Sequence, residues 1–169
     1  MKNIKSLLAI FVLTIAFSFA ASAQNITFTS LEGEKIDLQS QKGKVVVMAI
    51  GASWLPLSKG QADAINKLSR KYAGRDVSFF FIATDSETAK SKNFASNDDI
   101  RKFAESNKLT VSILRDTDGA QTVKQYKVDQ LPTFIILDKT GKLAMEPFGG
   151  IDTKNDISVT LSSKIDEIL

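Results

Sequence analysis

The sequence predicts one α/β domain in which a central mixed β-sheet carries helices on both faces. Residues 45–50 and 77–83 are continuous apolar runs rather than alternating ones, which is typical of strands buried on both faces. Apolar residues at helical spacing lie between these runs and again near the end of the chain. A turn at residues 139–141 separates two further apolar runs, which indicates a hairpin. Strands that alternate with helices in this way are typical of layered α/β folds.

The helix after the first buried strand is defined by its apolar spacing and by its two ends. Ile65, Leu68 and Tyr72 recur at helical spacing, and Gly74 can end the helix. Pro56 can open it, because a proline at the first helical position loses no hydrogen bond that the helix needs. We therefore expect the residues just before this helix to form a fixed corner between strand and helix.

The middle of the chain predicts a loop and then a second helix. Residues 85–97 are polar and rich in helix breakers, so we expect a long surface loop there. Ser96 or Asn97 can cap a helix that buries Ile100 and Phe103. The other expected elements are a short extended segment at 26–28, a strand at 111–114, a short helix at 119–126, hairpin strands at 134–137 and 143–145, and a last helix with an apolar stripe of Ile157, Leu161, Ile165 and Ile168.

The first 23 residues are expected to be a signal peptide. Lys2 and Lys5 form a basic start, residues 7–20 are apolar, and Ala21-Ser22-Ala23 offers the small residues of a cleavage site. The apolar stretch is short for a membrane span of about 20 residues, and no basic cluster follows it. We therefore expect a periplasmic or secreted domain over residues 24–169. No cysteine lies near the cleavage site, so we expect no lipid anchor and no stable membrane anchor after cleavage.

Charge and composition exclude several classes of function. Residues 24–169 carry 20 of the 22 basic residues against all 19 acidic ones, a net charge of +1. This balance gives no electrostatic footprint for nucleic acid. The chain contains no cysteine and no histidine. Stability must therefore come from the core alone, without disulfides, and a domain of this size can bury a sizeable core.

Five residues, Trp54-Leu55-Pro56-Leu57-Ser58, follow the first buried strand and lead into the next helix. This segment resembles the active-site corner of thioredoxin-like proteins, where the family carries Trp-Cys-x-x-Cys. In that comparison Leu55 stands where the nucleophilic cysteine would be, and Ser58 where the resolving cysteine would be. The resemblance is closest to the exported TlpA/ResA-like branch, and it implies a thioredoxin-like fold over residues 24–169.

Three further motifs follow the same order as in that branch. The segments Ile26-Thr27-Phe28, Glu32-Gly33-Glu34-Lys35 and Lys42-Gly43-Lys44 resemble its extended opening, its Gly turn and its Lys-Gly-Lys. Residues 131–138, followed by Lys139-Thr140-Gly141-Lys142, resemble its cis-proline loop, strand and Gly turn. Phe148-Gly149-Gly150 precede the last helix, as in the family.

The resemblance implies thiol-disulfide exchange, but the sequence lacks the groups that perform it. A thiolate must attack a disulfide, and no residue of this chain can supply one. Thioredoxins proper also carry a buried acid six residues before the nucleophile, where this chain has Ala49. We therefore expect no catalytic residue, no cofactor and no redox activity, as in a pseudoenzyme.

Other reactive or metal-binding sites find little support. Ser58 has no activating base, because the chain has no histidine and only Lys59 is adjacent. The alternative for Ser58 is a first-turn serine that contacts backbone N–H groups. Copper-handling relatives of this fold use two cysteines and a histidine, which are absent. Residues 116–119 (Asp-Thr-Asp-Gly) lack the Glu of a calcium loop at its twelfth position, where Lys127 stands, so we expect a turn and no metal site.

Pro132 indicates a function at the same corner that needs no thiol. The resemblance implies that this proline is cis, lies beside the corner and exposes backbone groups that pair with an extended peptide. Together with the apolar residues of the corner, this proline would form an exposed apolar patch, and such a patch commonly marks a binding surface. The alternative is that the proline persists because the loop geometry needs it, while Leu55 and Leu57 fold inward. The expected patch comprises Trp54, Leu55, Pro56, Leu57, Leu131 and Pro132.

We therefore expect an exported, redox-inactive thioredoxin-like protein that binds an extended peptide or a partner protein of the cell envelope. The expected binding residues are Trp54, Leu55, Pro56, Leu57, Ser58, Leu131, Pro132 and Thr133, the last three through main chain. Two alternatives stay open. One is an oxidoreductase or antioxidant role shared with the fold, which the absence of cysteine opposes. The other is a structural subunit of an envelope complex, with the patch buried in a permanent oligomer.

Overall fold

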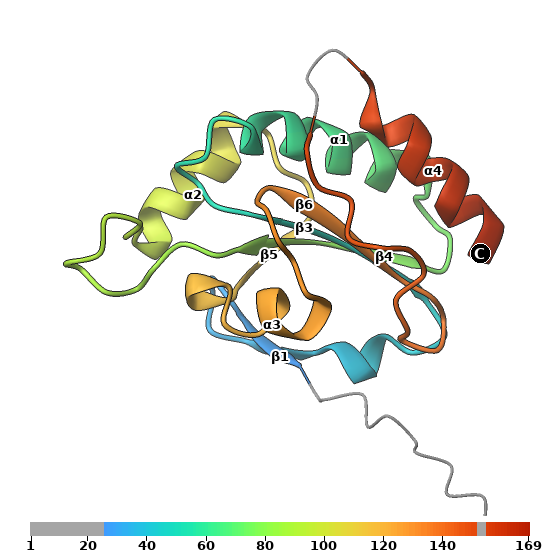
Figure 1. The fold of residues 1–169 in the computed structure, drawn as a ribbon, viewed down its shortest axis with the longest axis horizontal. Coiled ribbons are helices and arrows are strands. Elements are labelled where there is room, and N and C mark those ends of the chain that lie inside the picture. Colours follow the sequence, from blue (N-terminus) through green and yellow to red (C-terminus); the bar gives the residue numbers. More distant parts are fainter. Residues whose placement is uncertain (1–25, 152–154) are drawn as a thin grey trace, which may run out of the picture.

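The structure is a computed structural model that describes residues 26–151 and 155–169. The expected signal peptide lies outside these residues. Within them, one six-stranded sheet has the strand order β2-β1-β5-β4-β3-β6 (Figure 1). Strands β3, β4 and β5 run parallel, whereas β6 is antiparallel to β3 and β1 is antiparallel to both β5 and β2. The fold class expected from the sequence, a mixed sheet in an α/β domain, is confirmed.

The elements of this fold have the following bounds. The strands are β1 (Thr27–Ser30), β2 (Lys35–Asp37), β3 (Val45–Gly51), β4 (Val77–Ala83), β5 (Ser112–Arg115) and β6 (Thr133–Leu137). The helices are α1 (Ser58–Lys71), α2 (Asn97–Ser106), α3 (Thr122–Tyr126) and α4 (Ile157–Ile168), with short 3-10 helices η1 (Leu38–Gln41) and η2 (Thr117–Gly119).

Both faces of the sheet are covered, as the continuous apolar runs predict. Successive residues of a strand point to opposite faces. Val47 and Ala49 of β3 therefore join the core under α1, α2 and α4, while Met48 and Ile50 join the core on the side of α3 (Figure 1). All seven residues of β3 are buried. A strand covered on both faces needs no polar alternation, which explains its sequence.

The start of α1 differs from the sequence prediction. The helix begins at Ser58, so Pro56 lies two residues before its first residue. Two successive turns form the corner instead: the Leu55 N–H donates to the Ala52 carbonyl at 3.2 Å, and the Ser58 N–H donates to the Leu55 carbonyl at 3.0 Å. Leu55 therefore lies in a turn of its own, one turn outside the helix.

The start of α2 agrees with the prediction. Ser96 is its N-cap: the Ser96 hydroxyl accepts from the Asp99 N–H at 3.2 Å, and the Asp99 carboxylate accepts from the Ser96 N–H at 3.1 Å. This reciprocal pair is a capping box. The hydrogen bonds from Ser96 also lower the pKa of Asp99.

Two expected elements are corrected by the structure, and two short elements are added. Residues 143–145 form no strand: Leu143 makes an isolated bridge to Leu137, and the segment leads to Pro147, which has no N–H to donate. The helix expected at 119–126 is shorter, because Asp118 adopts a positive φ of 56° in η2 and the helix begins only at Thr122. The short elements β2 and η1 were not predicted.

Candidate functional site

One edge of the sheet collects the residues that the sequence singled out. The carboxyl ends of the parallel strands β3, β4 and β5 lie there, together with the start of the antiparallel strand β6. The corner 52–57, the loop 84–96 and the turn after Arg115 leave the sheet at this edge, and Pro132 enters it. Ligands of open α/β sheets bind at such an edge.

The apolar residues of the corner are partly exposed. Trp54 is 50% exposed and Leu57 is 38% exposed. Pro56 is exposed as well, while Leu55 and Leu131 are half-buried. The Leu131-Pro132 peptide bond is cis, as the resemblance implies. Ser58, Pro132 and Thr133 are buried, so among the expected binding residues these three lie beneath the exposed surface.

The main chain of Leu131 adds polar groups to this apolar surface. Among the described residues, neither its N–H nor its C=O takes part in a hydrogen bond. The neighbouring chain is well paired, since Thr133 lies opposite Ile50 in the ladder between β6 and β3. Leu131 therefore carries one donor and one acceptor without a partner among the described residues, in the segment that enters β6. Backbone groups of this kind are what an extended peptide pairs with.

Gln61 of α1 holds the cis-proline loop against the end of β3. Its side chain is completely buried, and its amide nitrogen donates to the Thr133 carbonyl at 2.7 Å and to the Ile50 carbonyl at 3.1 Å. One side chain thus joins α1, β3 and β6. Sequence reasoning missed this residue, although a polar residue at helical spacing with Ile65 and Leu68 was a signal for it.

Gly51, the last residue of β3, is required by close packing at the same place. A Cβ atom at this position would lie 2.4 Å from Oε1 of Gln61 and 2.9 Å from Oγ of Ser58. Both of these oxygens are buried and have no hydrogen-bond partner among the described residues. The expectation that the Ser58 hydroxyl contacts backbone N–H groups is therefore wrong. With its hydroxyl buried and without a hydrogen-bond partner among the described residues, Ser58 packs beneath the corner.

Asp85 fixes the other side of the corner. Its carboxylate is completely buried and accepts from the Ser53 N–H at 3.0 and 3.1 Å and from the Ser53 hydroxyl at 2.6 Å. Ser53 directly precedes Trp54, so this carboxylate positions the backbone that carries the exposed indole. The sequence placed Asp85 in a surface loop. The loop is real, but its first residues are buried in the site.

A cavity of about 480 Å³ continues the surface along α1 beyond Pro56. Ala64, Ile151 and Ile157 give it an apolar floor. At its rim, Lys67 and Asp156 form an ion pair at 2.8 Å.

The turn at Asp116 is structural. Its carboxylate accepts from the backbone N–H groups of Gln121 and Thr122 at 3.0 and 2.8 Å and from the Thr122 hydroxyl at 2.6 Å. Asp116 thereby holds the start of α3, which agrees with the expected turn.

Within the described residues, no group of three or more acidic side chains could hold a metal ion. The helices of the same residues are too short or too polar to span a membrane.

The sheet order, the corner at the end of β3 and the cis-proline before β6 together define a thioredoxin-like protein. The model of the AhpC/TSA family matches residues 19–145, and the chain belongs to this family. It is 31% identical to the thiol-disulfide oxidoreductase ResA of Bacillus thuringiensis subsp. konkukian, over 80% of this chain and 72% of that protein. It is 32% identical to the thioredoxin-like protein YneN of Bacillus subtilis, over 70% and 65% of the two chains.

A solved structure has the same fold at lower identity. The secreted disulfide oxidoreductase of Mycobacterium tuberculosis that is homologous to DsbE of E. coli superposes with a TM-score of 0.65 at 23% identity, over 85% of this chain and 96% of that one. The resemblance to ResA-like thioredoxin-fold proteins inferred from Trp54 to Ser58 is therefore confirmed. Unlike an oxidoreductase that works through cysteine thiols, this chain has no cysteine at all.

Proposed function

We propose that this protein binds an extended peptide, or an extended segment of a partner protein, without covalent chemistry at the corner between Trp54 and Pro132. One observation carries the proposal. Exposed apolar side chains, Trp54 and Leu57, share a sheet edge with the unpaired N–H and C=O of Leu131. The side chains supply apolar contact area, and the main chain supplies the direction and register of pairing.

The site is built to hold a fixed shape. Gln61 ties the cis-proline loop to β3, and Asp85 ties the corner to the end of β4. A binding surface held by buried hydrogen bonds loses little conformational entropy when a ligand arrives. Leu55, at the position of the nucleophilic thiol, and Leu57 beside it make the corner more apolar than a thiol at position 55 would.

We further propose that the protein has no thiol-disulfide exchange activity. The relatives ResA and the M. tuberculosis protein are named as oxidoreductases. Exchange requires a thiolate nucleophile and a second thiol to resolve the mixed disulfide. Leu55 and Ser58 occupy those positions here, and no other residue carries a thiol. An oxidoreductase or antioxidant role would need sulfur chemistry that this chain cannot supply.

The proposed place of action is outside the cytoplasm. The basic start, the apolar stretch and Ala21-Ser22-Ala23 support export. The secreted M. tuberculosis protein has the same fold, which is consistent with this. The remaining alternative is a structural subunit that buries Trp54 and Leu57 in a permanent oligomer. Mass measurement in solution separates the two: a monomer leaves the corner free for a ligand.

Trp54 provides a direct test, because it is the only tryptophan of the chain and it lies in the proposed site. The experiment titrates residues 24–169 with a set of capped, unstructured decapeptides of varied apolar content and follows the Trp54 emission. Binding at the corner gives a saturable change that Leu55→Asp weakens. If no peptide gives a saturable change and the protein is a monomer, the proposed function is wrong.

A further inference from the structure

The loop after β4 is held in a defined shape by its own backbone. At its base, the Ser86 N–H donates to the Asn93 carbonyl at 2.9 Å, and the Ala95 N–H donates to the Ser86 carbonyl at 3.1 Å. Nearer the tip, the Ser91 N–H donates to the Thr88 carbonyl at 2.8 Å. This projection, residues 86–95, is called the β4 loop below. Figure 1 shows it extending well beyond the sheet edge.

A buried cation anchors the β4 loop to the sheet. The side chain of Arg115, at the end of β5, is only 5% exposed. Its guanidinium donates to the carbonyl of Ala95 at 3.2 Å, to the carbonyl of Asp85 at 3.1 Å and to the side chain of Asn97 at 2.8 Å. Its Nε lies 3.3 Å from the Glu87 carboxylate. Burying a guanidinium is costly unless it is paired and hydrogen-bonded. Here the two terminal nitrogens donate hydrogen bonds, whereas Nε has no hydrogen-bond partner among the described residues and meets Glu87 only as an ion pair. The β4 loop is therefore positioned from both ends.

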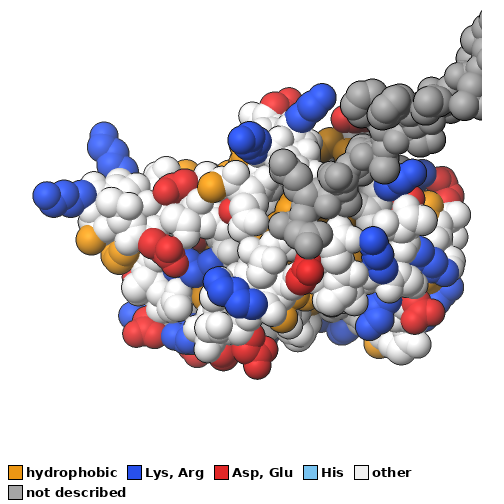
Figure 2. Space-filling view, turned by 90° about the horizontal axis from the view of Figure 1, so that it is seen from below, with side chains coloured by type: hydrophobic (Ala, Val, Ile, Leu, Met, Phe, Trp, Pro, Cys, Tyr) orange, Lys and Arg blue, Asp and Glu red, His pale blue; other side chains and the backbone are white. Residues whose placement is uncertain are grey.

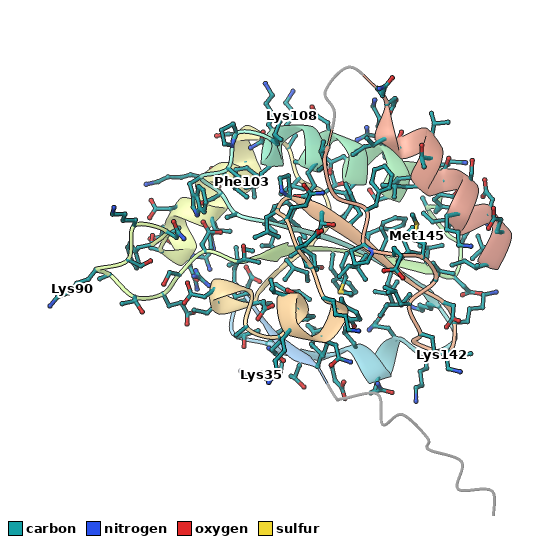
Figure 3. All side chains as sticks on the ribbon, viewed as in Figure 1. Lys35, Lys90, Phe103, Lys108, Lys142 and Met145 are labelled. Carbon is teal, nitrogen blue, oxygen red and sulfur yellow. The ribbon has the colours of Figure 1, made fainter. Side chains whose placement is uncertain are left out.

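The anchored loop displays one aromatic side chain and two lysines. Phe94 is 42% exposed, and Lys90 and Lys92 are exposed. Within residues 26–151 and 155–169, neither lysine forms an ion pair. Figure 3 shows Lys90 at the far end of the loop, and Figure 2 shows basic side chains projecting at that end with hydrophobic ones beside them.

The one acidic side chain of the β4 loop, Glu87, is paired with Arg115. Asp85 and Asp118 lie outside residues 86–95 and accept hydrogen bonds from the neutral hydroxyls of Ser53 and Ser86, at 2.6 and 3.3 Å. The unpaired charge on the β4 loop is therefore positive. A ligand segment that lies along it gains from carrying carboxylates.

The β4 loop adjoins the corner. Asp85, its neighbour in the chain, contacts Ser53, the neighbour of Trp54. Three of the five large hydrophobic side chains that are exposed in the described residues, Trp54, Leu57 and Phe94, come from this one sheet edge. A chain that pairs with Leu131 and crosses Trp54 can therefore continue onto Phe94.

We propose that the β4 loop is the second half of the binding surface and that it selects a peptide with an acidic flank. The apolar residues of the peptide contact Trp54 and Leu57, a further apolar residue contacts Phe94, and its Asp or Glu side chains pair with Lys90 and Lys92. This inference rests on the proposed function and adds the chemistry of the partner. A membrane is the less suitable occupant, because stable electrostatic attachment typically uses clusters of about four to eight basic residues.

The test compares two capped decapeptides that share the same three apolar residues and carry either four Glu or four Lys in the flank. Trp54 emission reports binding at the corner. We expect the acidic peptide to bind at least about tenfold more tightly, with a preference that falls as salt is raised, because exposed charges are screened. The Lys90→Glu/Lys92→Glu variant should reverse the preference. The Lys44→Glu/Lys142→Glu variant changes two exposed lysines at the opposite edge and should leave the preference unchanged, since Lys44 directly precedes the start of β3 and Lys142 lies far from Lys90 (Figure 3).

Each outcome decides a different claim. If both peptides bind equally and the loop variant behaves like wild type, the acidic-flank inference is wrong while the proposed function stands. If neither peptide gives a saturable response, the proposed function fails and the inference fails with it. If the two lysines instead govern cosedimentation with vesicles containing about 30% anionic lipid, without discrimination between the peptides, the partner is a membrane surface and the inference is overturned.

Discussion

The Gln61 side chain of α1 and the Thr133 carbonyl of β6 are joined by a 2.7 Å hydrogen bond, in full burial, directly after the cis-proline. The same amide nitrogen also donates to the Ile50 carbonyl. The relative position of the corner and the cis-proline loop therefore depends on one side chain that is neither at the surface nor in the motif. The same side chain supports the geometry on which peptide binding is proposed to rest.

Replacing Gln61 by leucine should destabilise the protein. The substitution leaves the Ile50 and Thr133 carbonyls without their side-chain donor, and a buried unpaired group costs about 1–3 kcal/mol. Urea unfolding of Gln61→Leu should show this loss, and Trp54 emission should shift as the corner loosens. Lys59→Met, an exposed change on the same helix, should have little effect on either measurement. A Gln61→Leu variant as stable as wild type would show that these hydrogen bonds do not contribute to the stability of the fold.

Glycine is required at position 51 but not at position 60. A Cβ at Gly51 would lie 2.4 Å from Gln61 Oε1, and overpacking of this kind costs about 1–3 kcal/mol. A Cβ at Gly60, inside α1, would meet no atom within 4 Å, and replacing a helical glycine by alanine gains about 0.5–1 kcal/mol. Thermal unfolding should therefore show a lower midpoint for Gly51→Ala and a higher one for Gly60→Ala. Equal midpoints would contradict the packing described for Gly51.

The strands β3 and β4 could be predicted from the sequence because burial on both faces leaves a continuous apolar pattern. The places of Leu55, Ser58 and Pro132 could be predicted because they lie in sequence motifs that resemble those of the thioredoxin-like family. Gln61 could not be assigned a role, because its partner Thr133 lies 72 residues away in the chain. The role of Asp85 could not be predicted for the same reason, since its partner Ser53 lies 32 residues away in the chain. Local pattern predicts elements, whereas a buried polar contact depends on the packing of the whole fold.

The attachment of α4 should weaken in acid through Asp156. Hydrogen bonds from Lys67, and then from Ser158, lower the pKa of Asp156 from 3.8 to about 2. A lowered carboxyl pKa in the folded state adds stability that is present above the unfolded value and is lost as the pH falls from about 3.8 to about 2. NMR titration of the Asp156 carboxyl carbon should give a midpoint near 2, and Lys67→Met should raise it. The Lys164→Met control should not, and a wild-type midpoint of 3.8 would contradict the contact.

The protein should not reduce insulin disulfides in the presence of dithiothreitol above the rate of dithiothreitol alone. The chain has no thiol at Leu55, at Ser58 or elsewhere. The Leu55→Cys/Ser58→Cys variant restores the two thiols and is the matched positive control; we expect it to fold and to form a disulfide at the corner. A protein-dependent rate in the wild type would show a reductive chemistry that needs no cysteine.

The most direct test of the central claim is the affinity of residues 24–169 for the acidic decapeptide, measured by titration calorimetry for wild type and for Leu55→Asp. Burial of a leucine contributes about 1.5–3 kcal/mol, and an aspartate adds a desolvation cost, so the affinity should fall at least about tenfold. The thermal midpoint should change little, because Leu55 is half-buried in a turn outside α1. Unchanged affinity in a folded variant would show that peptide binding does not use this corner, and loss of the fold would show that Leu55 belongs to the core.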